Sequence, residues 1–259
     1  MNIYIMTDME GISGLSRSEQ CKVGSSPWRD ALSLAEGDFN AAVAGAAAGG
    51  AKKIVLCDGH GAQFRVENMD PRAEYEQPVS ASNWLPAVKA GGFNAAFIIG
   101  AHAMAGTAGA FLEHTQSSAA WHNYTVGGKP WGEICQMAAT IGQLDIPVVL
   151  VTGDEAACQE ARRMLGEVET VVVKTALSRN FARVIAPSLT RKAIEEAAAR
   201  ALRHLGRVKP FKAGFPVEVR LEFNNAELAD GAARRPGVRR LDGRTVGWTA
   251  RSAAELLNP

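Results

Sequence analysis

Acidic and histidine side chains follow three short apolar runs of this 259-residue chain. Asp8 and Glu10 come after the first run, Asp58-Gly59-His60 ends the second, and His102 follows the third. Residues two apart in an extended chain point to the same side, so the carboxylates of Asp8 and Glu10 would face one point. Two carboxylates at such a short distance raise each other's pKa unless a cation neutralises them. Carboxylates and imidazoles together form a ligand set that suits zinc in a catalytic site.

Each of these residues alone also has an ordinary structural explanation. An Asp after a strand is often a turn or helix-capping residue, and Asp58 before Gly59 fits a turn. A histidine at a strand end is often a hydrogen-bonded structural residue. The coincidence of three strand ends favours a site, and the pattern leaves two kinds open, a metal site and an acid/base site without metal. If it is a metal site, one form is a site with two metal ions that catalyse hydrolysis.

Strands and helices are predicted to alternate along the first two thirds of the chain. Continuous apolar runs, which are typical of strands covered on both faces, lie at 3–7, 53–57, 95–100, 147–152 and 170–174. Helical patterns lie at 28–48, 133–144 and 154–165. The alternation predicts an α/β fold with a mostly parallel, doubly wound sheet. Ligands bind beyond the carboxyl ends of such strands, where the acidic and histidine residues stand.

The pattern changes after about residue 185. A helix is predicted from Pro187 to about Leu205, and residues 217–223 alternate apolar and polar, as a half-exposed strand of an antiparallel sheet does. Its expected partners are residues 238–241 and 245–249. We therefore expect a metal-binding catalytic α/β domain over residues 1–185 and a smaller α+β domain over residues 186–259.

Composition and charge argue against several classes of protein. The formal net charge is +1, so a nucleic-acid partner is not expected. No apolar run has transmembrane length, and the N-terminal segment is too short for the apolar part of a signal peptide. The four cysteines are widely spaced, which predicts reduced thiols and a cytoplasmic location. No GxGxxG follows the first strand, which disfavours a nucleotide-binding protein.

The remaining histidines and a group of arginines have open roles. His114 and His122 lie in a long stretch over 103–131, and a stretch of that length is usually functional or contains further elements. His204 is expected to be structural, near the end of its helix. We expect a solvated face for the C-terminal arginines, with an anchor for a substrate carboxylate as the alternative: Arg234, Arg235, Arg239, Arg240, Arg244 and Arg251.

Four short segments occur in a fixed order along the chain. They are Asp8-Met9-Glu10-Gly11-Ile12-Ser13-Gly14, Cys57-Asp58-Gly59-His60, Gly100-Ala101-His102-Ala103-Met104-Ala105-Gly106-Thr107 and Gly132-Glu133. In this combination the chain resembles the bacterial D-aminopeptidases of the dipeptide-transport-operon type, which are zinc metallopeptidases. The resemblance runs from Asn2 to about Ser178 and, more faintly, to the C-terminus.

The resemblance implies a site with two zinc ions per subunit. The ligands that it implies are Asp8, as the bridging carboxylate, with Glu10, His60, His102 and Glu133. Of these, Glu133 enters through the resemblance, although a Gly-Glu pair at a helix start could direct a carboxylate to the site. His114 matches the catalytic histidine of the family. For His114 we expect general acid/base catalysis or oxyanion stabilisation, with a metal-activated water as the nucleophile.

The implied activity is removal of the N-terminal residue, D-configured as in D-alanine, from short peptides or amino-acid amides. A ring-like homo-oligomer is also implied, a decamer by resemblance, with the active sites facing an internal chamber. Two alternatives are weighed beside it: a metal-dependent hydrolase of another bond, such as a non-peptide amide or a phosphoester, and a non-catalytic metal-binding α/β protein. The last would need a closed coordination shell, whereas five ligands shared by two ions leave positions for water.

Overall fold

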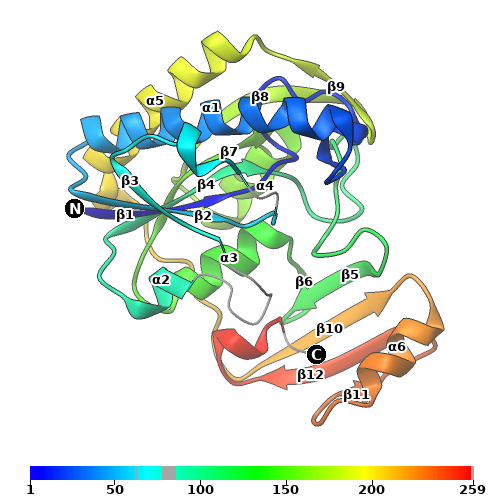
Figure 1. Cartoon of the computed structure of the whole chain (residues 1–259). Coiled ribbons are helices and arrows are strands. Elements are labelled where there is room, and N and C mark those ends of the chain that lie inside the picture. Colours follow the sequence, from blue (N-terminus) through cyan, green and yellow to red (C-terminus); the bar gives the residue numbers. More distant parts are fainter. Residues whose placement is uncertain (62–63, 78–85, 258–259) are drawn as a thin grey trace.

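The computed structural model describes residues 1–61, 64–77 and 86–257, which form two sheets with helices packed on them (Figure 1). The first sheet has seven strands in the described chain, in the order β3-β2-β1-β4-β7-β8-β9. These strands are β1 (Asn2–Thr7), β2 (Lys53–Asp58), β3 (Ala73–Glu76), β4 (Ala95–Ala101), β7 (Val148–Asp154), β8 (Glu169–Ser178) and β9 (Phe181–Val184). The five apolar runs predicted as strands are thus all strands of this sheet.

The first sheet is parallel except at one edge. Every neighbouring pair from β3 to β8 is parallel, and only β8 and β9 pair antiparallel. The chain builds outward from β1 through β2 to β3 and then returns to place β4 on the other side of β1. The order therefore reverses between β1 and β4, and the expected α/β fold with a mostly parallel, doubly wound sheet is confirmed.

Helices cover both faces of the first sheet, as Figure 1 shows. One face packs against α1 (Ser26–Ala48) and α5 (Pro187–Arg203). The other face packs against α2 (Pro86–Ala90), α3 (Glu133–Gly142) and α4 (Glu155–Leu165). Gly45 lies in the middle of α1, and a Cβ there would stand 2.2 Å from the carbonyl oxygen of Glu195, so this glycine lets α1 and α5 approach closely.

The second sheet is antiparallel and packs against α3 with its inner face. Its order is β11-β12-β10-β5-β6, from β5 (Trp121–Val126), β6 (Lys129–Pro130), β10 (Val217–Phe223), β11 (Arg239–Arg240) and β12 (Thr245–Ala250). The predicted alternation along β10 holds, since Val219, Leu221 and Phe223 are buried. A further helix, α6 (Ala226–Ala233), joins β10 to β11. The long stretch over 103–131 does contain further elements, β5 and β6.

The two sheets draw on interleaved parts of the chain. β5 and β6 precede residue 185 but pair in the second sheet, while α5 follows it and packs against α1. The division into domains 1–185 and 186–259 stays a prediction. Short 3-10 helices lie at Ser18–Cys21, Val66–Asn68, Leu205–Arg207 and Ala253–Glu255.

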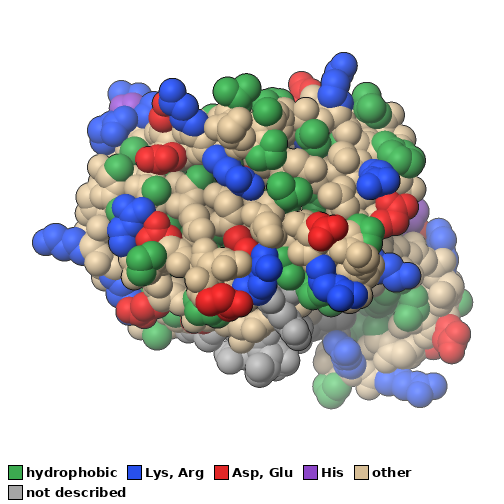
Figure 2. All heavy atoms as spheres, turned by 45° about the horizontal axis from the view of Figure 1, so that its top comes forward, with side chains coloured by type: hydrophobic (Ala, Val, Ile, Leu, Met, Phe, Trp, Pro, Cys, Tyr) green, Lys and Arg blue, Asp and Glu red, His purple; other side chains and the backbone are tan. Residues whose placement is uncertain are grey.

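The surface carries charges of both signs. Figure 2 shows basic and acidic side chains interspersed over one face of the molecule, in keeping with the net charge of +1. Across the described residues, no helix combines the length and apolar character needed to cross a bilayer.

Gly100, near the end of β4, is predicted to be irreplaceable. Its φ is +87°, and a Cβ would stand 2.2 Å from the carbonyl oxygen of Asp8. Gly100→Ala should lower the free energy of unfolding by more than about 2 kcal/mol, measured by urea denaturation.

The matched control is Gly231→Ala in α6, where a Cβ meets open space. This change should stabilise the chain by about 0.5–1 kcal/mol, because alanine is the better helix former. Equal unfolding midpoints for wild type and Gly100→Ala would show that the close approach of β4 to Asp8 is not required.

Candidate metal centre

The acidic and histidine residues gather at the carboxyl ends of three neighbouring strands. Asp8 and Glu10 follow β1, His60 follows β2, and His102 follows β4. These strands are adjacent in the order β2-β1-β4, so the expectation that they are neighbours is confirmed. The gathering lies where the strand order reverses, which is the usual ligand-binding position of an open parallel sheet.

Backbone contacts hold the segment after β1 on the segment after β4. The Asp8 N–H donates to the Ile99 carbonyl over 2.8 Å, and the Gly11 N–H donates to the Gly100 carbonyl over 2.7 Å. A Cβ at Gly11 would stand 2.0 Å from the carbonyl oxygen of Ala101, so only glycine fits there. These contacts fix the turn that carries Asp8 and Glu10 against the strand that carries His102.

One group of potential metal ligands consists of Asp8, Glu10 and His60, whose ligand atoms all lie within 4.8 Å of one another. His60 Nε2 lies 3.4 Å from Glu10 Oε1. Glu10 Oε2 and His60 Nδ1 are buried and have no hydrogen-bond partner among the described residues. Buried polar atoms are normally paired, so these two atoms indicate that the site is built for a further partner.

The other group consists of His102, His114 and Glu133, again within 4.8 Å. His102 Nε2 lies 3.3 Å from Glu133 Oε1 and 3.5 Å from Asp8 Oδ2. His102 Nδ1 lies 3.0 Å from the Ala103 carbonyl oxygen and donates to it, because a carbonyl can only accept. This bond directs the Nε2 lone pair of His102 toward the carboxylates, as histidine ligands are commonly oriented.

Glu133 is placed by the start of α3. It is the first residue of that helix, after Gly132 as N-cap, and the positive end of a helix dipole favours a carboxylate there. Its Oε1 accepts the backbone N–H of Gln116 over 2.7 Å. The structure thus brings Glu133, which only the resemblance had indicated, to the same cluster as Asp8 and His102.

His114 lies against the cluster with a fixed ring orientation. Its Nδ1 donates to the Leu112 carbonyl over 2.8 Å, and its ring stacks on His102 with centroids 3.9 Å apart and 12° between planes. Its Nε2 is 3.7 Å from Glu133 Oε1. Burial, and then the charge of His102, lower the pKa of His114. Position and tautomer leave the Nε2 lone pair of His114 facing the cluster.

The loop that carries His114 has an unusual backbone. Leu112 and Gln116 have φ values of 51° and 60°, which lie in the left-handed region that non-glycine residues rarely adopt. Gln116 also donates from Nε2 to Gln136 Oε1 over 2.9 Å. The sequence gives no signal for this conformation, since neither position is a glycine or an asparagine. Strained positions of this kind concentrate at functional sites.

The charged groups of the cluster shift one another's pKa values. Burial and the neighbouring Glu10 raise the pKa of Asp8 well above its usual value. Burial alone would raise the pKa of Glu10, but His60 and His102 outweigh it and hold that pKa well below its usual value. Burial opposes the charged form of His60, yet Glu10 raises its pKa to about 9. The carboxylates therefore require positive charge beside them, and a set of carboxylates and imidazoles fits zinc.

Other residues singled out in the sequence lie outside the cluster. Asp58 has the turn role that its sequence suggests, because its Oδ1 accepts the N–H groups of His60 and Gly61. His122 on β5 and His204 after α5 are exposed. Three of the C-terminal arginines pair with carboxylates on the second sheet and α6, as a solvated face does: Arg239 with Glu218, Arg240 with Asp230 and Arg244 with Glu222.

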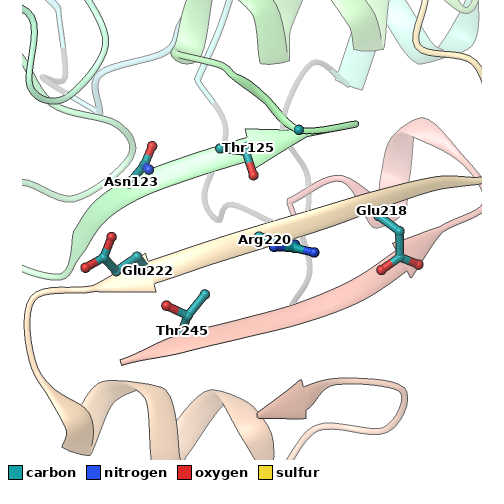
Figure 3. Close-up of a pocket in the computed structure, with 7 residues that line it drawn as sticks. Asn123, Thr125, Glu218, Arg220, Glu222 and Thr245 are labelled. Atoms are coloured by element: carbon teal, nitrogen blue, oxygen red, sulfur yellow. The ribbon is translucent and has the colours of Figure 1, made fainter. Parts of the chain in front are cut away.

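The second sheet carries a separate polar hollow on its outer face. Figure 3 shows Glu218, Arg220 and Glu222 of β10 beside residues of β5 and β12. None of the cluster residues lines this hollow. Since Glu218 and Glu222 are engaged by arginines, we assign the hollow no chemistry.

Metal-dependent hydrolases are the class that this fold and this cluster define, since two groups of potential metal ligands, one of them including His114, share an edge of the sheet. The chain belongs to the D-aminopeptidase family, peptidase family M55, whose model matches residues 1–258. The resemblance stated from the sequence motifs is confirmed.

A comparison of sequences and a comparison of structures show how close the similarity is. The chain is 29% identical to the D-aminopeptidase of Bacillus subtilis (strain 168) over 252 residues, which are 95% of this chain and 90% of the relative. The structure of this chain resembles that of the Zn-dependent D-aminopeptidase DppA from Bacillus subtilis, described as a self-compartmentalizing protease. The TM-score is 0.91 and the sequence identity is 25%. That similarity covers 99% of this chain and 94% of the solved one.

A buried carboxyl group supports the site from α4. Glu160 Oε2 accepts the Met104 N–H over 2.8 Å, and a Cβ at Gly132 would stand 2.6 Å from Glu160 Oε1. Burial raises the pKa of Glu160 from 4.5 to about 7. The folded state therefore holds a proton more tightly than the unfolded state, and stability falls as the pH rises from about 4.5 to about 7.

Glu160→Gln should remove this pH dependence, because glutamine resembles the protonated acid. The variant should match wild type near pH 5 and exceed its free energy of unfolding by on the order of 2 kcal/mol at pH 8, measured by urea denaturation. The control is Glu155→Gln at the exposed start of α4, which should show the same small difference at both pH values. A pH-independent difference for Glu160→Gln would contradict the assignment.

Proposed function

We propose that this chain is a zinc-dependent aminopeptidase that removes an N-terminal D-amino acid from short peptides or amino-acid amides. The observation that carries the proposal is the meeting of two potential ligand groups at Asp8, with His114 of the second group stacked on His102. Membership of the D-aminopeptidase family supports the same reaction. The Zn dependence of the structurally similar DppA supports the metal.

The proposed ligands are Asp8, Glu10, His60, His102 and Glu133. Asp8 is the proposed bridge, because it belongs to the group with Glu10 and His60 while its Oδ2 also faces His102 Nε2. Together the five residues would hold two zinc ions. Zinc in such a site lowers the pKa of a bound water to about 7 and polarises a carbonyl oxygen.

His114 is the proposed acid and base. With its Nδ1–H held by the Leu112 carbonyl, the neutral ring presents a lone pair at Nε2. His114 would accept a proton at Nε2 from the attacking water and return it to the departing amine as the C–N bond breaks. The stacking on His102 and the strained ends of the loop keep the ring in place for both transfers.

Assembly and location are part of the proposal. A ring-like homo-oligomer, with a decamer as the family resemblance suggests, would enclose the sites as in a self-compartmentalizing relative. Four large apolar residues exposed between 177 and 189 support an interface there: Leu177, Phe181, Ile185 and Leu189. Sedimentation should give a mass several times that of the 27.5 kDa chain. The four cysteines are free, which supports a reducing compartment such as the cytoplasm.

Cleavage of alanine p-nitroanilides tests the activity. The zinc-loaded chain should release p-nitroaniline from the D-alanyl amide faster than from the L-alanyl amide. Chelation should abolish the release, and added zinc should restore it. Release that is unaffected by chelation, or hydrolysis of p-nitrophenyl phosphate with neither amide cleaved, would overturn the proposed reaction.

Replacement of His114 tests its role. His114→Ala should keep the zinc content of wild type but lower kcat by about 100-fold or more, because a positioned acid/base contributes about 10²–10⁴-fold. The matched control is His122→Ala, at an exposed histidine of β5, which should leave kcat unchanged. Retained activity in His114→Ala would eliminate the catalytic role, and lost zinc would reassign His114 as a ligand.

A further inference from the structure

Lys174 is a fully buried cation in the middle of β8. Its exposed fraction is 0%, although a lysine side chain is almost never fully buried unless it has a partner. Among the described residues, no carboxylate lies within 4.0 Å of its ammonium nitrogen. In the sequence, Lys174 is the last residue of the strand run 170–174, and the sequence alone gave no role for it.

The ammonium group makes contacts to two parts of the site. Its Nζ donates to the backbone carbonyl of Glu10 over 2.6 Å, although 164 residues separate them in the chain. The same nitrogen lies 4.8 Å from the centre of the Phe111 ring, within the range of a cation–π interaction. Burial lowers the pKa of Lys174 to about 8, and the amine can donate to the Glu10 carbonyl in either protonation state.

Phe111 connects this contact to the loop of His114. The Phe111 N–H donates to Asp154 Oδ2 over 2.9 Å, which fixes the start of the loop on the end of β7. The next residue is Leu112, whose carbonyl accepts from Nδ1 of His114. The Lys174 side chain is therefore in contact both with the turn that carries Glu10 and with the start of the loop that carries His114.

A purely structural role does not account for an amine at this position. A methionine has a similar length and would fill the space without the desolvation of a charge, and such replacements of buried charges are often neutral or stabilising. What methionine cannot supply is the donor to the Glu10 carbonyl or the attraction to the Phe111 ring.

We propose that Lys174 is a positioning residue that sets the turn of Glu10 and the loop of His114 relative to one another. It acts through the backbone of a proposed zinc ligand and through the ring that precedes the catalytic loop, so this inference rests on the proposed function. Groups that orient metal ligands typically contribute about 10–100-fold to metal affinity or activity.

The test compares Lys174→Met with wild type in three measurements. Zinc affinity, measured by competition with a chromogenic chelator, should fall by about 10–100-fold. On the zinc-saturated protein, kcat for D-alanyl p-nitroanilide should fall by about tenfold or more with KM within about twofold, because positioning of reacting groups is changed rather than substrate binding. The thermal unfolding midpoint of the metal-free protein should be unchanged or higher.

Three further variants separate the parts of the proposal. Lys53→Met, at a half-exposed lysine of β2 paired with Glu74, is the matched control and should change none of the three measurements. Phe111→Leu keeps an apolar side chain without the ring, so it should lower kcat while zinc affinity stays near wild type. Lys174→Gln keeps an N–H donor and should recover part of the zinc affinity lost in Lys174→Met.

These measurements distinguish failure of the positioning role of Lys174 from failure of the proposed function. If wild type binds zinc and cleaves the amide while a folded Lys174→Met has the same zinc affinity and kcat, only the positioning role is overturned. If neither Lys174→Met nor Lys174→Gln folds without metal, Lys174 serves stability and the role is likewise overturned. A wild-type chain that binds no zinc overturns the proposed function, and this inference with it.

Discussion

Carboxylates held together away from water repel one another, and this repulsion is the constraint on which the rest of the site depends. Asp8 and Glu10 are almost fully buried, and the turn between them is fixed by backbone hydrogen bonds to the end of β4. Burial disfavours the charged forms of His60 and His102, yet the neighbouring carboxylates raise the pKa of both histidines. A divalent cation between such groups removes the repulsion directly, since opposite charge is what stabilises ionised carboxylates in a buried place.

The fold supplies rigid positions for that chemistry. The parallel sheet brings strand ends from distant parts of the chain to one edge, and the reversal of strand order beside β1 opens the place where they meet. Helix α3 adds Glu133 at its positively polarised start, and the loop before β5 adds His114. Asp154 and Lys174, on strands β7 and β8, join the start of this loop to the sheet through their contacts with Phe111. Proteins commonly place functional groups on a loop that a rigid scaffold positions.

Much of this arrangement was predictable from the sequence. Continuous apolar runs identified five of the six parallel strands and missed the short β3, and the residues after them identified three of the four segments that carry the proposed ligands. The resemblance was needed for Glu133 and His114, because neither follows a strand. Other features had no sequence signal: the left-handed backbone of Leu112 and Gln116, and the reach of Lys174 to Glu10, depend on contacts between segments that are distant in the chain. The strand β5 was missed for the same reason, since its partner β10 lies far along the chain, and β6 pairs only with β5.

The number of zinc ions that the metal-free chain binds is the most direct test of the account. Isothermal titration calorimetry with zinc chloride should give two ions per wild-type chain. His60→Ala removes the histidine of one ligand group and should leave one ion bound, at the group that contains His102 and Glu133. A wild-type chain that binds no zinc, or a His60→Ala variant that binds zinc as wild type does, would contradict the claim that these carboxylates and histidines form a metal centre.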